Sequence, residues 1–123
     1  MIPTMKTRYN DIAPFVTRDD SLIRELMHPR THGNQNQSFA EAIIEPGRET
    51  LLHRHHVAEE LYHIAQGQGS MSLGDETFAV AVGDTVCIPP GVAHKIRNTG
   101  ADELKILCCC APAYDHSDTE RLE

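Results

Sequence analysis

The sequence predicts an all-β protein built as a sandwich or a barrel. Short apolar runs recur about every ten residues, and most end at glycine, proline or aspartate. No segment keeps an apolar period of about 3.6 residues over three turns, so we expect little helix beyond a turn near residues 11–15. The predicted strands are Ser21–Met27, Phe39–Glu45, Thr50–Arg54, Glu60–Gln66, Gly69–Leu73, Glu76–Val80, Thr85–Ile88, His94–Asn98 and Glu103–Ala111.

Turn residues separate these strands. Gly74 and Asp75 stand between two strands and predict a two-residue hairpin, because glycine accepts a positive φ. The polar segment 28–36 is predicted to be a loop. Further turns are predicted at Pro46–Gly47, Gly83–Asp84 and Pro89–Gly91.

The last predicted strand is apolar on both of its faces. Alternate positions divide its apolar side chains into Leu104, Ile106, Cys108 and Cys110 on one face and Leu107 and Cys109 on the other. A strand of this kind is usually covered on both sides. In so small a barrel we expect the second cover to be another copy of the chain, which predicts a homodimer.

The length fits one domain. With 123 residues and 13.7 kDa, the chain has no room for a second domain of ordinary size. The apolar pattern is weak at both ends of the chain. We therefore divide it into an N-terminal arm (1–20), a barrel (21–113) and a C-terminal tail (114–123).

Composition and charge exclude several classes of function. Eleven Lys and Arg against eighteen Asp and Glu give a net charge of −7, which disfavours binding to nucleic acid or to anionic membranes. No apolar run approaches the roughly 20 residues of a membrane span, and the first residues lack the apolar core of a signal peptide. The four cysteines, Cys87 and Cys108–Cys110, do not form a C-x-x-C motif and are read as free thiols, which predicts a cytoplasmic protein.

Histidine is the unusual residue of this chain. There are eight, and four of them fall between positions 53 and 63. His53 and His55 are two apart, so they share one face of a strand. Two such imidazoles with a carboxylate from the next strand, such as Glu60, can hold a divalent transition metal. His94 follows a Pro-Gly turn and has the parity of an apolar, inward face.

Two spaced motifs resemble those of the cupin superfamily. The first consists of Gly47, His53, His55, Glu60 and Gly67, and the second of Gly83, Pro89, Gly91, His94 and Asn98. The chain is also similar to small single-domain proteins described as mannose-6-phosphate isomerase-like. The resemblance implies a double-stranded β-helix (jelly-roll) barrel with one metal inside. It also implies the ligands: His53, His55, Glu60 and His94.

The resemblance leaves the chemistry open. Related proteins use Mn, Fe, Ni, Cu or Zn as cofactor, and some have no known reaction. We expect a metal-dependent enzyme acting on a small oxygenated molecule, of isomerase, lyase or dioxygenase type. The alternative is a non-catalytic barrel that binds a metal or a small ligand. One carboxylate against a divalent ion leaves the site formally positive, which favours an anionic or chelating oxygen substrate.

Several other residues have both a functional and an ordinary structural interpretation. Glu59 competes with Glu60, and spacing and parity favour Glu60. Tyr62 either donates a hydrogen bond to a ligand or fills the core. Parity directs His56 and His63 outward, and position predicts solvated side chains for His28, His32 and His116. No general base is evident; Glu25, Tyr114 and His116 are candidates of equal standing.

Overall fold

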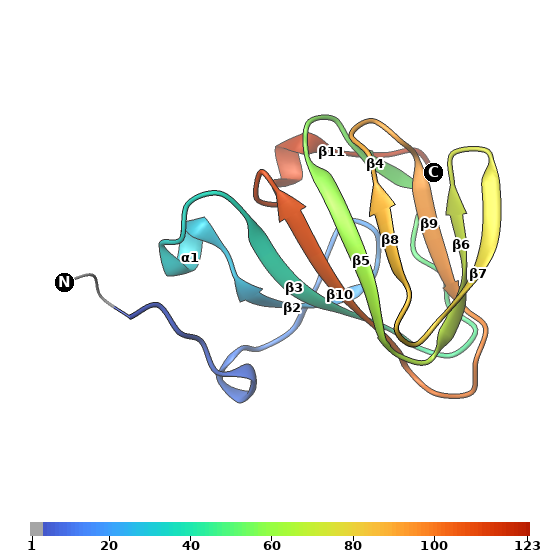
Figure 1. Ribbon diagram of the computed structural model, residues 1–123, viewed down its shortest axis with the longest axis horizontal. Helices are drawn as coiled ribbons and strands as arrows, with labels where there is room; N and C mark the ends of the chain where they lie inside the picture. Colours follow the sequence, from blue (N-terminus) through green and yellow to red (C-terminus); the bar gives the residue numbers. More distant parts are fainter. Residues whose placement is uncertain (1–3) are drawn as a thin grey trace.

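The computed structural model describes residues 4–123, which form two antiparallel sheets facing each other (Figure 1). The six-stranded sheet has the order β1 (Phe15–Val16), β2 (Leu22–Met27), β3 (Ser38–Ile44), β10 (Leu104–Ala111), β5 (Glu59–Gln66) and β8 (Thr85–Ile88). The five-stranded sheet has the order β11 (Thr119–Arg121), β4 (His53–His55), β9 (His94–Asn98), β6 (Gln68–Leu73) and β7 (Glu76–Ala81). The chain crosses between the sheets repeatedly, for example from β4 to β5 and from β8 to β9. This winding makes the predicted double-stranded β-helix.

The predicted strands are confirmed, with one change in where pairing begins. Residues 50–54 were expected as one strand, but regular pairing starts at His53. The N–H of Leu51 donates to the carbonyl oxygen of Asp19 at 2.8 Å. This N–H is therefore not available to pair with the neighbouring strand. The N-terminal segment is therefore held against the start of β4.

Two short strands lie in the terminal segments, where the sequence predicts none. β1 pairs with β2, and β11 pairs with β4. With two and three residues, these strands are too short to show an alternating pattern. Their pairing depends on partners brought in by the rest of the fold.

Helical structure is minor, as predicted, and among the described residues consists of three short elements outside the strands. They are the 3₁₀ turns η1 (Tyr9–Asp11) and η2 (His116–Asp118) and the one-turn helix α1 (Pro29–His32). The expected turn near residues 11–15 is therefore found slightly earlier, and the expected loop 28–36 contains α1. Proline occupies the first turn of α1, and Gly33 ends it at a φ of 89°, so the local sequence carries both helix signals.

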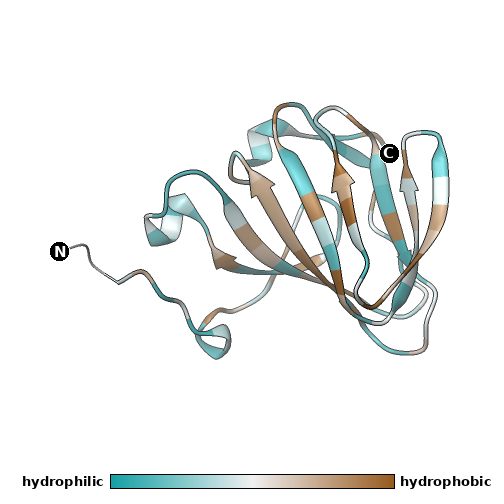
Figure 2. Ribbon diagram, viewed as in Figure 1, coloured by the Kyte–Doolittle hydropathy of each residue, from teal (hydrophilic) through white to brown (hydrophobic). Residues whose placement is uncertain are grey.

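The core fills the space between the two sheets. Alternate residues of β10 point into it, and Leu104 and Ile106 are at most 1% exposed. They pack with Ile64 of β5, Met71 of β6 and Ile96 of β9. Figure 2 shows β10 coloured hydrophobic over most of its length, whereas β5 alternates between polar and apolar residues. The two-faced character predicted for β10 is thus visible, with Leu107 and Cys109 half-buried on its outer side.

The structure can be compared with the sequence for the state of the cysteines and for membrane-spanning helices. All four cysteines are free, with Cys87 exposed and Cys108 and Cys110 buried. Within residues 4–123, no helix is long and apolar enough to cross a membrane.

Candidate metal centre

Strand register brings the predicted histidines together between the sheets. His53 of β4 lies directly opposite His94 of β9, and His55 lies opposite Thr119 of β11. Directly opposed residues point to the same face of a sheet. The three imidazoles are consequently buried on the inner face, at 3%, 4% and 0% exposure for His53, His55 and His94. The ring centroids of His53 and His94 are 4.2 Å apart.

Backbone carbonyls orient two of these rings. Nδ1 of His53 is 2.7 Å from the carbonyl oxygen of Leu51, and Nδ1 of His94 is 3.0 Å from that of Val92. A carbonyl oxygen can only accept, so each Nδ1 carries the proton and donates it. Each Nε2 therefore presents a lone pair, the form in which histidine binds a metal.

A hydroxyl from the C-terminal strand orients the third ring. Nδ1 of His55 is 2.9 Å from Oγ1 of Thr119, and that hydroxyl donates to the carbonyl oxygen of Asp115 at 3.0 Å. Because the hydroxyl proton is used on Asp115, Oγ1 accepts from Nδ1 of His55. His55 thus has the same tautomer as the other two, with its Nε2 lone pair turned inward.

Glu60 reaches the cluster from the opposite sheet. Its Oε1 lies 3.1 Å from Nε2 of His55 and 3.7 Å from Nε2 of His94, and its side chain is buried. Its Oε2 accepts from the thiol of Cys110, its partner on β10, at 3.2 Å. Burial favours a raised pKa for Glu60, but in the metal-free protein a proton on the Nε2 of His55 or His94 outweighs burial and holds the pKa at about 2. Glu59, the competing carboxylate, is exposed.

The arrangement of donors fits a metal ion. The ligand atoms of the three histidines all lie within 4.8 Å of one another. Nε2 of His94 is buried and has no hydrogen-bond partner, which is costly for a polar atom unless something binds it. Nε2 of His55 directs a lone pair at a carboxylate oxygen, a contact that is favourable only with a proton or a cation between the two atoms. Burial and the His94 ring lower the pKa of His53, so His53 is neutral and able to bind a metal at neutral pH.

Comparison with known proteins agrees with this site. The family model described as "Cupin domain" matches residues 40–110, which include all four predicted ligands. The chain belongs to the cupin family. Its double-stranded β-helix and its buried three-histidine cluster beside Glu60 are thus the fold and the site that the two motifs predict.

Relatives of this cupin extend over most of its length. It is 52% identical over 119 residues to the uncharacterized protein MJ1618 of Methanocaldococcus jannaschii, covering 97% of this chain and 95% of that protein. It is 31% identical over 86 residues to a Thermotoga maritima protein named oxalate-binding protein, covering 70% and 67% of the two chains. Oxalate decarboxylase from Bacillus subtilis superposes with a TM-score of 0.84 at 21% identity, over 99% of this chain and 33% of that one. At that identity the likeness concerns the fold.

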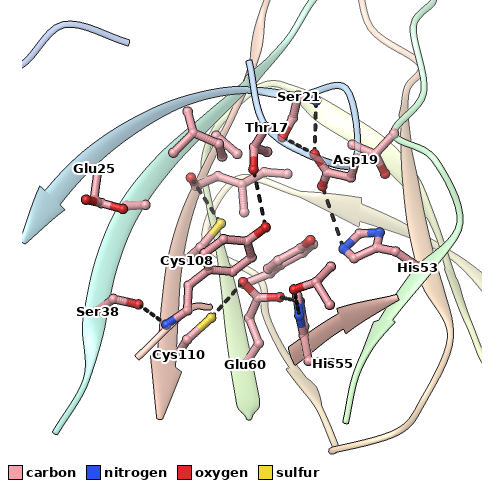
Figure 3. Close-up of a pocket in the computed structure, with 18 of the residues that line it drawn as sticks. Thr17, Asp19, Ser21, Glu25, Ser38, His53, His55, Glu60, Cys108 and Cys110 are labelled. Atoms are coloured by element: carbon pink, nitrogen blue, oxygen red, sulfur yellow. Dashed lines mark hydrogen bonds and ion pairs between the residues drawn. The ribbon is translucent and has the colours of Figure 1, made fainter. Parts of the chain in front are cut away.

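A small cavity opens beside the histidines of the cupin barrel. Its volume is about 60 Å³. Tyr62, Tyr114 and Glu25 are among its lining residues, and Figure 3 shows Glu25 on the far side from His53 and His55. Tyr62 is buried, with its ring centroid 6.0 Å from that of His94. The apolar part of the wall consists of Phe15, Ile23, Ala40, Ala42, Ile44, Ile96 and Ile106.

Two of the three candidate general bases line this cavity directly. The hydroxyl of Tyr114 lies 3.0 Å from Nδ1 of the third candidate, His116, which is exposed. Tyr114 and His116 thus connect the cavity wall with solvent. The carboxylate of Glu25 belongs to β2 and is half-buried.

The remaining histidines lie outside the cluster, and one expectation about them is wrong. His56 and His63 are exposed, as their parity predicts. His28 was expected to be solvated, but it is 5% exposed. Its Nδ1 caps α1 by accepting from the N–H of Arg30, and its Nε2 lies 2.7 Å from the carbonyl oxygen of Tyr114. The Pro29 that follows is the sequence signal for this cap.

Sequence spacing missed three residues of the site: Asp19, Cys110 and Thr119. Asp19 Oδ2 lies 3.7 Å from Nε2 of His53, Cys110 donates to Glu60, and Thr119 orients His55. The inward parity of Cys110 was visible in the sequence. Asp19 and Thr119 lie in the terminal segments, and no local pattern marks them. Asn98, by contrast, stabilises a turn, accepting from the N–H of Gly100 at 2.9 Å.

Proposed function

We propose that this cupin holds one divalent transition metal through His53, His55, His94 and Glu60 and acts as a metal-dependent enzyme on a small oxygenated molecule. One observation carries the proposal. Three imidazoles with the same tautomer place their ligand atoms within 4.8 Å of one another, and among the described residues the buried Nε2 of His94 has no hydrogen-bond partner. Building such a cluster into the core is costly unless a cation occupies it.

The cavity beside the cluster supports a role beyond metal storage. Four protein ligands leave positions free on a metal that takes five or six, and the cavity provides the space for a substrate. A bound ion would supply a Lewis acid that polarises an oxygen of the substrate. The hydroxyl of Tyr114 and the carboxylate of Glu25 line the same space and can exchange protons with a bound molecule.

A non-catalytic binding barrel is the second candidate. The relative of Thermotoga maritima is named for binding oxalate, and part of the wall of the present cavity is aliphatic. A barrel that only binds a metal or a small ligand needs no general base. The two candidates therefore differ in turnover, and a protein that takes up no metal would favour the plain binding barrel.

The outer face of the six-stranded sheet supports the predicted homodimer. Phe39 and Leu61 are 40% and 41% exposed, and in the register both flank Cys109 on β10. Light scattering coupled to size exclusion should give twice the 13.7 kDa chain mass. A charge placed there by Leu61→Lys should shift the mass toward the monomer. The exposed thiol of Cys87 supports a reducing, cytoplasmic location.

Elemental analysis of protein purified without chelators tests the proposed function. We expect about one transition-metal ion per chain. Iron or copper together with O₂ uptake on a candidate substrate would identify a dioxygenase. Zinc, nickel or manganese with turnover in the absence of O₂ would identify an isomerase or lyase. Protein that contains no metal and takes none up contradicts the proposal.

A further inference from the structure

A second carboxylate faces the histidine cluster, and it comes from the N-terminal segment. Asp19 is 8% exposed, and its Oδ2 lies 3.7 Å from Nε2 of His53. Figure 3 shows Asp19 beside His53 and Glu60 beside His55, on two sides of the cluster.

Hydrogen bonds hold Asp19 in this position. Its Oδ1 accepts from the N–H of Ser21 at 3.0 Å and from the Ser21 hydroxyl. Its backbone carbonyl accepts from the N–H of Leu51, two residues before His53. The backbone of Asp19 is therefore held next to the start of β4, the strand that carries His53 and His55. The free side-chain oxygen of Asp19, Oδ2, is the one that faces the cluster.

The separation of Asp19 from His53 equals the 3.7 Å between Glu60 and His94 and is longer than the 3.1 Å between Glu60 and His55. Nδ1 of His53 donates to the carbonyl of Leu51, so its Nε2 directs a lone pair toward Oδ2. Two atoms bound to one ion at about 2.1 Å each lie about 3.0–3.6 Å apart for angles between 90° and 120°. The 3.7 Å separation lies just beyond that range. The cation that satisfies Glu60 is therefore close to Asp19 as well.

Asp19 changes the charge of the loaded site. Counting Glu60 alone, a divalent ion leaves one positive charge; with Asp19 the sum is zero. Among the described residues, no Lys or Arg lines the cavity, and Glu25 adds a third carboxylate at the far side. Arg18 precedes Asp19 in the chain, but it is exposed and does not belong to the cavity wall.

We propose that Asp19 determines the ligand class of this site: an uncharged molecule with an apolar body that binds through a neutral oxygen, rather than a dicarboxylate. This inference rests on the proposed metal site and revises the anionic substrate expected from the two motifs. A dianion entering the cavity would face two buried carboxylates beside the ion and a third across the space, with aliphatic wall between them. In such surroundings like charges repel strongly because little water screens them. An uncharged oxygen avoids this repulsion.

The test compares two probes of the same shape on zinc-loaded protein. Oxalate carries two negative charges at pH 7, and oxamide has the same number of heavy atoms and none. Asp19→Asn removes one charge and keeps the acceptor for Ser21. We expect this variant to bind oxalate at least tenfold more tightly than the natural chain in calorimetric titrations, with oxamide affinity changed less than twofold. Asp20→Asn, the same change at the exposed neighbour, should leave both affinities unchanged.

The outcomes separate this inference from the proposed function. Zinc content is measured first on each protein. If the natural chain takes up no zinc, the proposed function fails and this inference fails with it. If zinc is bound but Asp19→Asn does not tighten oxalate binding, this inference alone is overturned. Asp19→Ser, which removes the charge but retains an acceptor, must shift oxalate affinity in the same direction as Asp19→Asn.

Discussion

Two regions of the chain contribute to this site, and only one of them can be recognised from a sequence motif. Residues 47–98 contain both motifs and supply His53, His55, Glu60 and His94. The terminal segments supply Asp19 and Thr119, which contact two of these histidines but belong to no spaced pattern. In the proposed site the motif region provides the metal ligands. The terminal segments contribute Thr119, which orients His55, and Asp19, which adds a negative charge beside His53. A ligand set therefore predicts a metal centre better than it predicts the selectivity of that centre.

The largest expected effect comes from removing a donor of the motif region. His94→Ala takes away a fully buried Nε2 that has no hydrogen-bond partner among the described residues. We expect zinc affinity to fall roughly 1,000-fold or more, which exceeds the 10–100-fold typical of an outer partner. A competition titration against a chromophoric chelator measures it. His56→Ala, within the span of the first motif but exposed, is the control and should bind zinc normally. An equal loss in both variants would contradict the assigned ligand set.

The carboxylate of the motif region should appear in the acid stability of the metal-free protein. The pKa of Glu60 is lowered from 4.5 to about 2, so the folded state resists protonation of this group. Its contribution is fully present above pH 4.5 and is lost as the pH falls toward 2, by about 3 kcal/mol in total. Urea unfolding between pH 6 and 3 follows this loss. In Glu60→Gln the decline below pH 4.5 should be shallower, and an unchanged slope would count against the contact.

A smaller effect is expected from the terminal region. Thr119→Val keeps the shape but leaves Nδ1 of His55 without its acceptor. Loss of such an outer partner should weaken zinc binding by roughly 10-fold, within the usual range. Thr77→Val, on an exposed position of β7, is the matched control. If Thr119→Val bound zinc as tightly as the control, the terminal strand would have no part in orienting the site.

The smallest effect is expected from a histidine that lies outside both groups. His63 is exposed, and its Nδ1 lies 2.8 Å from Oγ1 of Thr85. His63→Ala should leave zinc affinity unchanged and alter the free energy of unfolding by less than about 0.5 kcal/mol. A clear loss of zinc would mean that the cluster extends beyond the inner face.

Much of the fold could be predicted because most strands carry local sequence signals. Alternation and turn residues located the strands, and parity placed His53 and His55 on one shared face and His94 on an inward face. What could not be predicted depends on contacts between distant segments. Two residues of β1 and three of β11 carry no readable period, and the contact of Asp19 with His53 exists only after the N-terminal segment has docked on β4. His28 was misjudged because its burial depends on the C-terminal segment, through Tyr114.

X-ray absorption at the zinc edge of the loaded protein tests the central claim most directly, because it identifies the atoms around the ion. The account predicts a shell of nitrogen and oxygen at about 2.0–2.2 Å with the scattering pattern of three imidazoles. The thiol of Cys110 lies 3.2 Å from Glu60 and is the nearby alternative donor. A sulfur neighbour at about 2.3 Å, or the absence of imidazole scattering, would contradict the account.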